Sequence, residues 1–278
     1  MKDLSNENII HIQNNGIEYI QFKRLLEYKD ILVHGYSIGR NVNFRTLRVG
    51  ENMDKENVKN GIENYKNLCN SLNLDYRNIV KTNQTHTNNV KIISKKINKD
   101  EPDINLLEYK DTDGLITNKK GLILSTTNAD CILLLFFDPI KKVIANVHSG
   151  WRGTLKRIAV KTIEKMEEEY NSKPENIIVC ISPSIRKCHF EVDEDVKDLF
   201  EKEFKEFEKY KFIEKQENKN KWNIDTVYLN KEMLISLGIK ETNIIDSKIC
   251  TVCNKDKIHS YRVEKQEYGL ETAIIALK

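Results

Sequence analysis

The stretch of sequence that decides the fold is residues 128–153, which read NADCILLLFFDPIKKVIANVHSGWRG. The apolar run 132–137 ends at an Asp-Pro pair, which is a turn signal, and a second apolar run follows at 143–147. Two such runs joined by a short turn predict a β-hairpin, which we place with its turn centred on Pro139 and Ile140. The centre of the turn fixes which residues of the two strands face each other.

In this register Cys131 and His148 lie opposite each other, with Cβ atoms about 4.5–5.5 Å apart. A thiolate and an imidazole at that separation can bind one metal ion, because Zn–S bonds are about 2.3 Å long and Zn–N bonds about 2.0–2.1 Å. A cysteine that begins an apolar strand is often only a small core residue. A histidine that follows a strand is often only structural. The pairing across the hairpin and the following Gly150-Trp151-Arg152-Gly153 strengthen the case for a metal site, and the structural alternatives stay open at this point.

A third ligand is needed, because two ligands do not hold zinc. His86 is the best candidate, since it lies in a polar loop between two expected strands, where a rigid scaffold can aim a side chain. His189, beside Cys188, is the alternative. A set of two histidines and one cysteine leaves the fourth position open, which is the pattern of a catalytic zinc that lowers the pKa of bound water to about 7.

Two other groups of residues suggest ligand contacts or metal chemistry. Arg152 begins a helix expected over 153–170, where helix amides and the helix dipole favour a phosphate or another anion; the alternative is an arginine paired with a surface carboxylate. Tyr261 and Arg262 offer a phenol and a guanidinium near the C-terminus. Residues 250–253 form a bare CxxC without a second CxxC at zinc-ribbon spacing, and we interpret both thiols as structural.

The composition excludes several classes of protein. The 278 residues contain 45 Lys and Arg against 42 Asp and Glu, a net charge of +3 that does not indicate nucleic-acid binding. No apolar run approaches the roughly 18 residues of a membrane span, and the N-terminus lacks the apolar core of a signal peptide. Six irregularly spaced cysteines indicate reduced thiols. We therefore expect a cytoplasmic protein that binds neither nucleic acid nor membrane.

The order of expected elements indicates the fold class. Strands occur in adjacent runs with helices interspersed, which favours an α+β fold over a doubly wound one. We expect a single domain over residues 1–278, with a mixed β-sheet flanked by helices. The expected helices include 54–72, the helix at 153–170, an amphipathic surface segment at 201–221, and a helix that Asp225 caps.

Five ordered motifs resemble the bacterial laccase-domain family, described as multicopper polyphenol oxidase-like, as purine nucleoside phosphorylases or as peptidoglycan editing factors. The motifs and their residues here are QxH at 84–86, ADC at 129–131, HxGWRG at 148–153, a GPxI…CxYEV-like stretch at 182–192, and CTxC with SYR at 250–253 and 260–262. The chain departs from the family pattern at Ile38-Gly39-Arg40, at Ser182 and at Val263. The residues that match the metal ligands of the family are all present, whereas the residues expected around the substrate differ in part from the family pattern.

The resemblance implies a function as well as a site. It implies that His86, Cys131 and His148 bind zinc and that the pocket accepts a purine nucleoside and phosphate, with Arg152, Tyr261 and Arg262 as substrate contacts. The implied reactions are phosphorolysis of adenosine, inosine and methylthioadenosine, and deamination of adenosine. We expect a monomer or a small homo-oligomer.

Three other functions stay open from the sequence. One is a hydrolase that edits peptidoglycan precursors, which zinc would serve equally well. Another is a copper-dependent polyphenol oxidase, although six histidines are too few for a multicopper cluster. The last is a non-enzymatic module stabilised by zinc, which predicts a fourth protein ligand such as His189.

Overall fold

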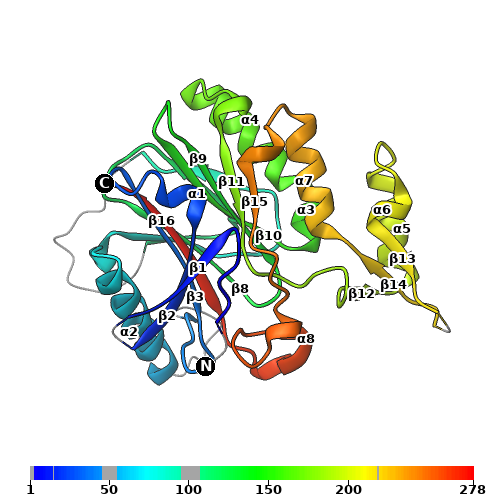
Figure 1. Ribbon diagram of the computed structural model, residues 1–278, viewed down its shortest axis with the longest axis horizontal. Coiled ribbons are helices and arrows are strands. Elements are labelled where there is room, and N and C mark those ends of the chain that lie inside the picture. The colour runs from blue at the N-terminus through cyan, green and yellow to red at the C-terminus, as the bar shows by residue number, and fades with distance from the viewer. Residues whose placement is uncertain (1–2, 15, 46–54, 95–106, 218) are drawn as a thin grey trace.

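The predicted hairpin is present in the computed structural model, which describes residues 3–14, 16–45, 55–94, 107–217 and 219–278 (Figure 1). Strands β9 (Ile132–Asp138) and β10 (Val143–Ser149) pair antiparallel. The predicted register is wrong by two residues, because His148 faces Leu133 rather than Cys131.

The turn explains the difference in register. The Asp138 carboxylate accepts hydrogen bonds from the backbone N–H groups of Ile140 (2.8 Å) and Lys141 (3.0 Å), and Lys142 adopts a left-handed conformation with φ of 53°. These contacts close a four-residue turn between Asp138 and Val143, where the sequence analysis assumed a tighter one.

The hairpin lies within a six-stranded mixed sheet, whose strand order is β15-β11-β9-β10-β7-β5. Its remaining strands are β15 (Ile244–Asp246), β11 (Ile178–Ile181), β7 (Gly114–Thr117) and β5 (Val90–Ile92). The apolar side chains of β9 and β10 are buried on both faces of this sheet, which explains why both strands are continuous apolar runs.

A second, seven-stranded sheet packs against the first, in the order β1-β2-β3-β16-β8-β4-β6. Its strands are β1 (Ile9–Asn14), β2 (Ile17–Phe22), β3 (Leu32–Ile38), β16 (Glu271–Leu277), β8 (Ile123–Asn128), β4 (Ile79–Thr82) and β6 (Leu107–Tyr109). Leu133 and Phe137 from the first sheet meet Leu124 and Ile275 from the second in one apolar core.

Helices cover the outer faces of both sheets (Figure 1). Helix α2 (Lys55–Ser71) packs Tyr65 and Leu68 on the seven-stranded sheet. Helices α4 (Ile158–Tyr170) and α7 (Thr226–Ser236) cover the six-stranded sheet, and the Asp225 side chain caps α7 as predicted. The short helices α1 (Lys23–Leu26) and α8 (Tyr261–Glu264) connect strands.

Two predicted helices differ in the structure. The segment 153–170 is broken, because Arg157 adopts a left-handed conformation (φ 57°) between α3 (Trp151–Leu155) and α4, and ion-pairs there with Glu203 and Glu206. The segment 201–221, expected as an amphipathic surface helix followed by a loop, instead contains the end of a helix over Glu194–Glu203, a second short helix over Lys209–Phe212 and a strand over Ile213–Lys215. Its buried Phe204 and Phe212 meet edge to face with ring centroids 6.3 Å apart, which folds the chain back on itself.

That folded segment belongs to a small lobe at the right of Figure 1. The lobe combines α5 (Glu194–Glu203) and α6 (Lys209–Phe212) with a three-stranded sheet. The strands of this sheet are β12 (Glu191–Val192), β14 (Trp222–Ile224) and β13 (Ile213–Lys215). The apolar core of the lobe includes Phe200, Phe212 and Trp222 and continues to Leu229 and Met233 of α7.

The predicted α+β class with mixed sheets and flanking helices is confirmed. The strands divide into two main sheets, whereas one mixed sheet was predicted. The sequence could not indicate this division, because the alternation of apolar residues does not reveal which strands share a sheet. Within the described ranges, none of the helices combines the length and the apolar character needed to cross a lipid bilayer.

Candidate metal centre

The structure brings His86, Cys131 and His148 together at one end of the six-stranded sheet. His86 lies in the loop between β4 and β5, Cys131 directly precedes β9, and His148 is the penultimate residue of β10. Their donor atoms all lie within 4.8 Å of one another. The shift of two residues in the register preserves the face on which a side chain points, so Cys131 and His148 meet as diagonal rather than direct neighbours.

A buried carboxylate that the sequence analysis missed organises this group. One oxygen of Asp113 accepts hydrogen bonds from His148 Nδ1 (2.8 Å) and from the backbone N–H of His86 (3.1 Å). Its other oxygen accepts from the backbone N–H groups of Thr85 (3.2 Å) and Thr87 (2.8 Å) and from the Thr87 hydroxyl (2.7 Å). Asp113 therefore holds the loop that carries His86 and fixes Nδ1 of the His148 ring, which leaves Nε2 for Cys131 or a metal, as carboxylates do behind metal-bound histidines.

The charges of these groups support one another. Burial alone would raise the pKa of the Cys131 thiol, but the charge and hydrogen bond of His148, together with His86, lower it to about 6. Burial likewise opposes the charge on His148, whose pKa Cys131 and Asp113 nevertheless raise to about 9. Hydrogen bonds from His148 and Thr87 outweigh burial at Asp113 and lower its pKa to about 2. At neutral pH the metal-free group therefore holds a thiolate, the form of cysteine that binds metals.

Gly150 leaves the space in which the donors meet. A Cβ atom at this position would lie 2.7 Å from His86 Cδ2, 3.0 Å from Cys131 Sγ and 3.2 Å from His86 Nε2. The backbone φ of Gly150 is −66°, so its conformation suits any residue and only the close approach requires glycine. The glycine of the HxGWRG motif thus has a steric role beside the donor atoms.

The donor set fits a zinc ion. A tetrahedral zinc separates a bound sulfur from a bound imidazole nitrogen by about 3.6 Å, and Cys131 Sγ lies 3.9 Å from His86 Nε2. Three protein donors leave one position for water or substrate, as in catalytic zinc sites. His189, the alternative third ligand, lies elsewhere, in a separate group with three cysteines.

A pocket of about 530 Å³ opens in front of these donors. Arg152, Tyr261 and Arg262 line it together with all three donor residues, although these six residues are widely separated in the sequence. Arg152 is exposed and its guanidinium lies over the Trp151 ring, 4.0 Å from the centroid. Among described residues it pairs with no carboxylate, in contrast to Arg157 of the same segment. Helix α3 is only five residues long, so its dipole adds little to the charge of Arg152.

Further cations and several aromatic rings complete the pocket. Lys81 and Arg45 line it beside Arg152 and Arg262, and the buried Nε of Arg45 has no hydrogen-bond partner among described residues. Neither side chain was predicted from the sequence as part of the site. The aromatic side chains that line the pocket are Phe44, Trp151, Phe190, Tyr261 and Tyr268. The pocket thus combines flat apolar surfaces with an excess of positive charge, which suits an aromatic ligand and an anion.

Among the residues that the structure describes, Asp130 is the one carboxylate in the wall of the pocket, and it is engaged elsewhere. Asp130 has φ of 84° and precedes Cys131 in the wall of the pocket. Its two oxygens accept hydrogen bonds from the Thr251 hydroxyl (2.5 Å) and from the backbone N–H of Arg262 (2.7 Å). Asp130 therefore ties the C-terminal segment to the metal-binding segment. Arg40, in the loop that departs from the family pattern, pairs with Glu264 and does not line the pocket.

Comparison with known proteins agrees with this architecture. Residues 35–278 match the family described as multi-copper polyphenol oxidoreductase laccase. The chain belongs to this family. A purine nucleoside phosphorylase of Clostridium acetobutylicum is 31% identical over 271 residues, covering 95% of this chain and 100% of that protein.

Two further proteins that are similar to this chain extend the comparison. Adenosine deaminase RL5, from an unknown prokaryotic organism, is 28% identical over 195 residues, covering 70% of this chain and 73% of that protein. The crystal structure of YlmD from Geobacillus stearothermophilus has the same fold, with a TM-score of 0.81 at 22% identity over 97% of this chain and 99% of that one. The relatives support an enzyme of purine nucleosides.

Proposed function

We propose that this protein is a zinc-dependent enzyme that cleaves adenosine, inosine and methylthioadenosine with phosphate and deaminates adenosine. The observation that carries the proposal is the His86–Cys131–His148 donor set at the wall of a pocket with an excess of cations. The relatives named purine nucleoside phosphorylase and adenosine deaminase support the same two reactions. We propose these three donors as the zinc ligands, and a single domain over residues 1–278.

The pocket offers a place for each part of the substrates. The purine ring stacks on aromatic side chains of the wall, which include Trp151 and Tyr261. Arg152 and Arg262 hold phosphate by charge-assisted hydrogen bonds. In phosphorolysis a phosphate oxygen bonds to the anomeric carbon while the bond from that carbon to the purine nitrogen breaks, and the purine leaves with the electron pair. Fixed cations keep the phosphate in line for this displacement.

The metal adds to what these side chains do. A bound zinc ion would supply Lewis-acid chemistry, which polarises a substrate atom or lowers the pKa of a water molecule. Asp113 fixes Nδ1 of the His148 ring, which leaves Nε2 for the metal, and Gly150 keeps the space between the donors open. Copper is a weaker candidate, because a multicopper oxidase needs many more histidines than the six of this chain.

Product analysis tests the proposal. The zinc-loaded protein is incubated with adenosine in the presence and in the absence of phosphate. We expect adenine and ribose 1-phosphate with phosphate, inosine without it, and neither product from the Cys131→Ala variant. If zinc-loaded protein turns over no nucleoside but hydrolyses a peptidoglycan precursor, the proposed function is wrong and the editing hydrolase replaces it.

A further inference from the structure

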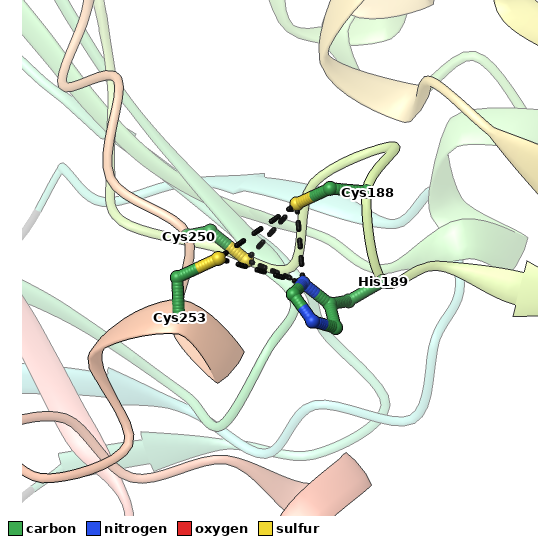
Figure 2. A group of neighbouring side chains, drawn as sticks. All are labelled: Cys188, His189, Cys250 and Cys253. Carbon is green, nitrogen blue, oxygen red and sulfur yellow. Dashed lines mark hydrogen bonds between the residues drawn. The ribbon is translucent and has the colours of Figure 1, made fainter.

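A second group of metal-type side chains lies outside the pocket wall. Cys188, His189, Cys250 and Cys253 place one ligand atom each within 4.8 Å of the others (Figure 2). In Figure 2 the three sulfurs surround the Nδ1 side of the His189 ring. The two pairs of residues are far apart in the sequence and meet only in the fold.

The topology explains why these residues meet. Strands β11 and β15 pair in parallel, with Ile181 facing Asp246, so the chain leaves both strands at the same edge of the sheet. The two following loops then run side by side, with a β-bridge between Ser184 and Cys250. A backbone hydrogen bond from Thr251 N–H to the Ser184 carbonyl (3.1 Å) continues this pairing.

The distances match those of a tetrahedral zinc site. Bond lengths of about 2.3 Å to sulfur and 2.0–2.1 Å to nitrogen separate two bound sulfurs by about 3.8 Å and a sulfur from a nitrogen by about 3.6 Å. Cys188 Sγ lies 3.7 Å from Cys250 Sγ and 4.0 Å from Cys253 Sγ. His189 Nδ1 lies 3.1, 3.6 and 3.5 Å from the sulfurs of Cys188, Cys250 and Cys253.

Neither hydrogen bonding nor a disulfide accounts for this arrangement. Nδ1 of His189 has one proton or one lone pair, so it cannot form good hydrogen bonds with three sulfurs at once. The two sulfur pairs at 3.7 and 4.0 Å are far beyond the roughly 2.05 Å of a disulfide bond. One cation at the centre of the four atoms would bind all of them.

We propose that Cys188, His189, Cys250 and Cys253 form a structural zinc site, separate from the three-donor centre in the pocket. Four protein ligands close the coordination of the metal, and three cysteines with one histidine are a common structural zinc set. Soft sulfur donors in a tetrahedral arrangement favour zinc over magnesium, calcium and manganese. The bare CxxC of the sequence thus has its partner in the adjacent residues Cys188 and His189.

The site joins two loops that form part of the pocket wall. Ile185 and Phe190 line the pocket on either side of the first ligand pair. On the second loop, the Thr251 hydroxyl donates to Asp130, which precedes Cys131 and also holds Arg262. A metal ion that joins these loops therefore fixes one wall of the pocket without touching the substrate.

Metal analysis of full-length protein purified without added metal tests the proposal, with the zinc content measured by elemental analysis and native mass spectrometry. Wild-type protein is expected to carry two zinc ions per chain, and Cys253→Ser and Cys131→Ala one each. The Cys69→Ala variant, which removes a thiol outside both groups, is the matched control and retains two. If Cys253→Ser binds as much zinc as the wild type, or if mass analysis finds a disulfide within the group, the proposal is wrong.

Two further measurements test the same proposal. The first uses wild-type protein and so does not depend on whether Cys253→Ser folds. The second removes the contribution of metal bound at the three-donor centre. Cys188 is exposed, and in the wild-type protein its thiol should resist alkylation until a chelator removes the metal; rapid alkylation of the zinc-bearing protein would overturn the proposal. In a Cys131→Ala background, cobalt(II) should give thiolate-to-metal charge-transfer absorption that Cys253→Ser abolishes. Failure of nucleoside turnover would leave both readouts unaffected.

Discussion

Replacing Asp113 by asparagine tests how the first metal centre is built. The carboxylate accepts five hydrogen bonds, two on the oxygen that faces His86 and His148 and three on the oxygen that faces Thr85 and Thr87. In either orientation, the amide of asparagine turns an NH₂ group toward donors and removes at least two of these bonds. Hydrogen bonds to a charged group contribute about 1.5–3 kcal/mol each, so we expect the protein with an empty first centre to lose about 3 kcal/mol or more of its free energy of unfolding.

The effect on the metal follows from the orientation of the His148 ring. Without a carboxylate at Nδ1, the ring is no longer held with Nε2 toward the metal, and loss of such a partner typically lowers metal affinity about 10–100-fold. This corresponds to about 1.4–2.7 kcal/mol of binding free energy. We expect the zinc dissociation constant of the first centre to rise by that factor in a chelator-competition assay.

The matched control is Asp111→Asn, which makes the same change of charge two residues away. Asp111 is exposed, binds the side chains of Thr85 and Asn89, and contacts neither histidine. In the unfolding assay and in the chelator assay, the proposed structural site at Cys188, His189, Cys250 and Cys253 carries zinc. Only the metal content of the first centre therefore differs. If Asp113→Asn folds and binds zinc with wild-type affinity, or if the control loses as much affinity, Asp113 does not orient the ligand as argued.

Three further predictions concern space, charge and pH. Gly150→Ala inserts a methyl group 2.7 Å from the His86 ring and should lower zinc affinity in the chelator assay, whereas Gly121→Ala, with open space around it, should not. Arg152→Ala should reduce kcat/KM for phosphorolysis about 10–100-fold and leave deamination within about twofold, because only phosphorolysis needs the bound anion; equal losses would refute that role. Burial lowers the pKa of His34 from 6.5 to about 3. The unfolded chain therefore binds an extra proton between these values, and stability falls with decreasing pH by about 1.4 kcal/mol per unit. Urea unfolding of His34→Gln between pH 7 and 5 should show a shallower loss, and an unchanged slope would contradict the assignment.

The sequence predicts the hairpin and the three donors better than it predicts the geometry between them. The apolar runs around Pro139 identify the strands, but the register depends on hydrogen bonds from Ile140 and Lys141 to Asp138 that no pattern of apolar residues reveals. An error of two residues leaves each side chain on its own face of the sheet. The inference that Cys131 and His148 meet therefore survives the wrong register.

Other features depend on contacts between distant segments. Asp113 is separated from both histidines in the sequence and carries no motif, so only the fold shows that it contacts the loop of His86 and the ring of His148. The group of Cys188, His189, Cys250 and Cys253 forms because β11 pairs in parallel with β15. This pairing brings together two loops whose residues Cys188 and Cys250 are 62 positions apart. At the break, Arg157 forms ion pairs with Glu203 of α5 and with Glu206, which helical periodicity cannot indicate.

The measurement that tests the account most directly is nucleoside turnover as a function of metal occupancy of the first centre. Metal is removed from that centre and zinc is titrated back while ribose 1-phosphate formation from adenosine and phosphate is followed. We predict that activity rises in proportion to zinc bound and reaches its maximum at one ion per first centre, and that His148→Ala with an intact second site stays inactive. Full activity in metal-free protein, or in the His148→Ala variant, would contradict the central claim.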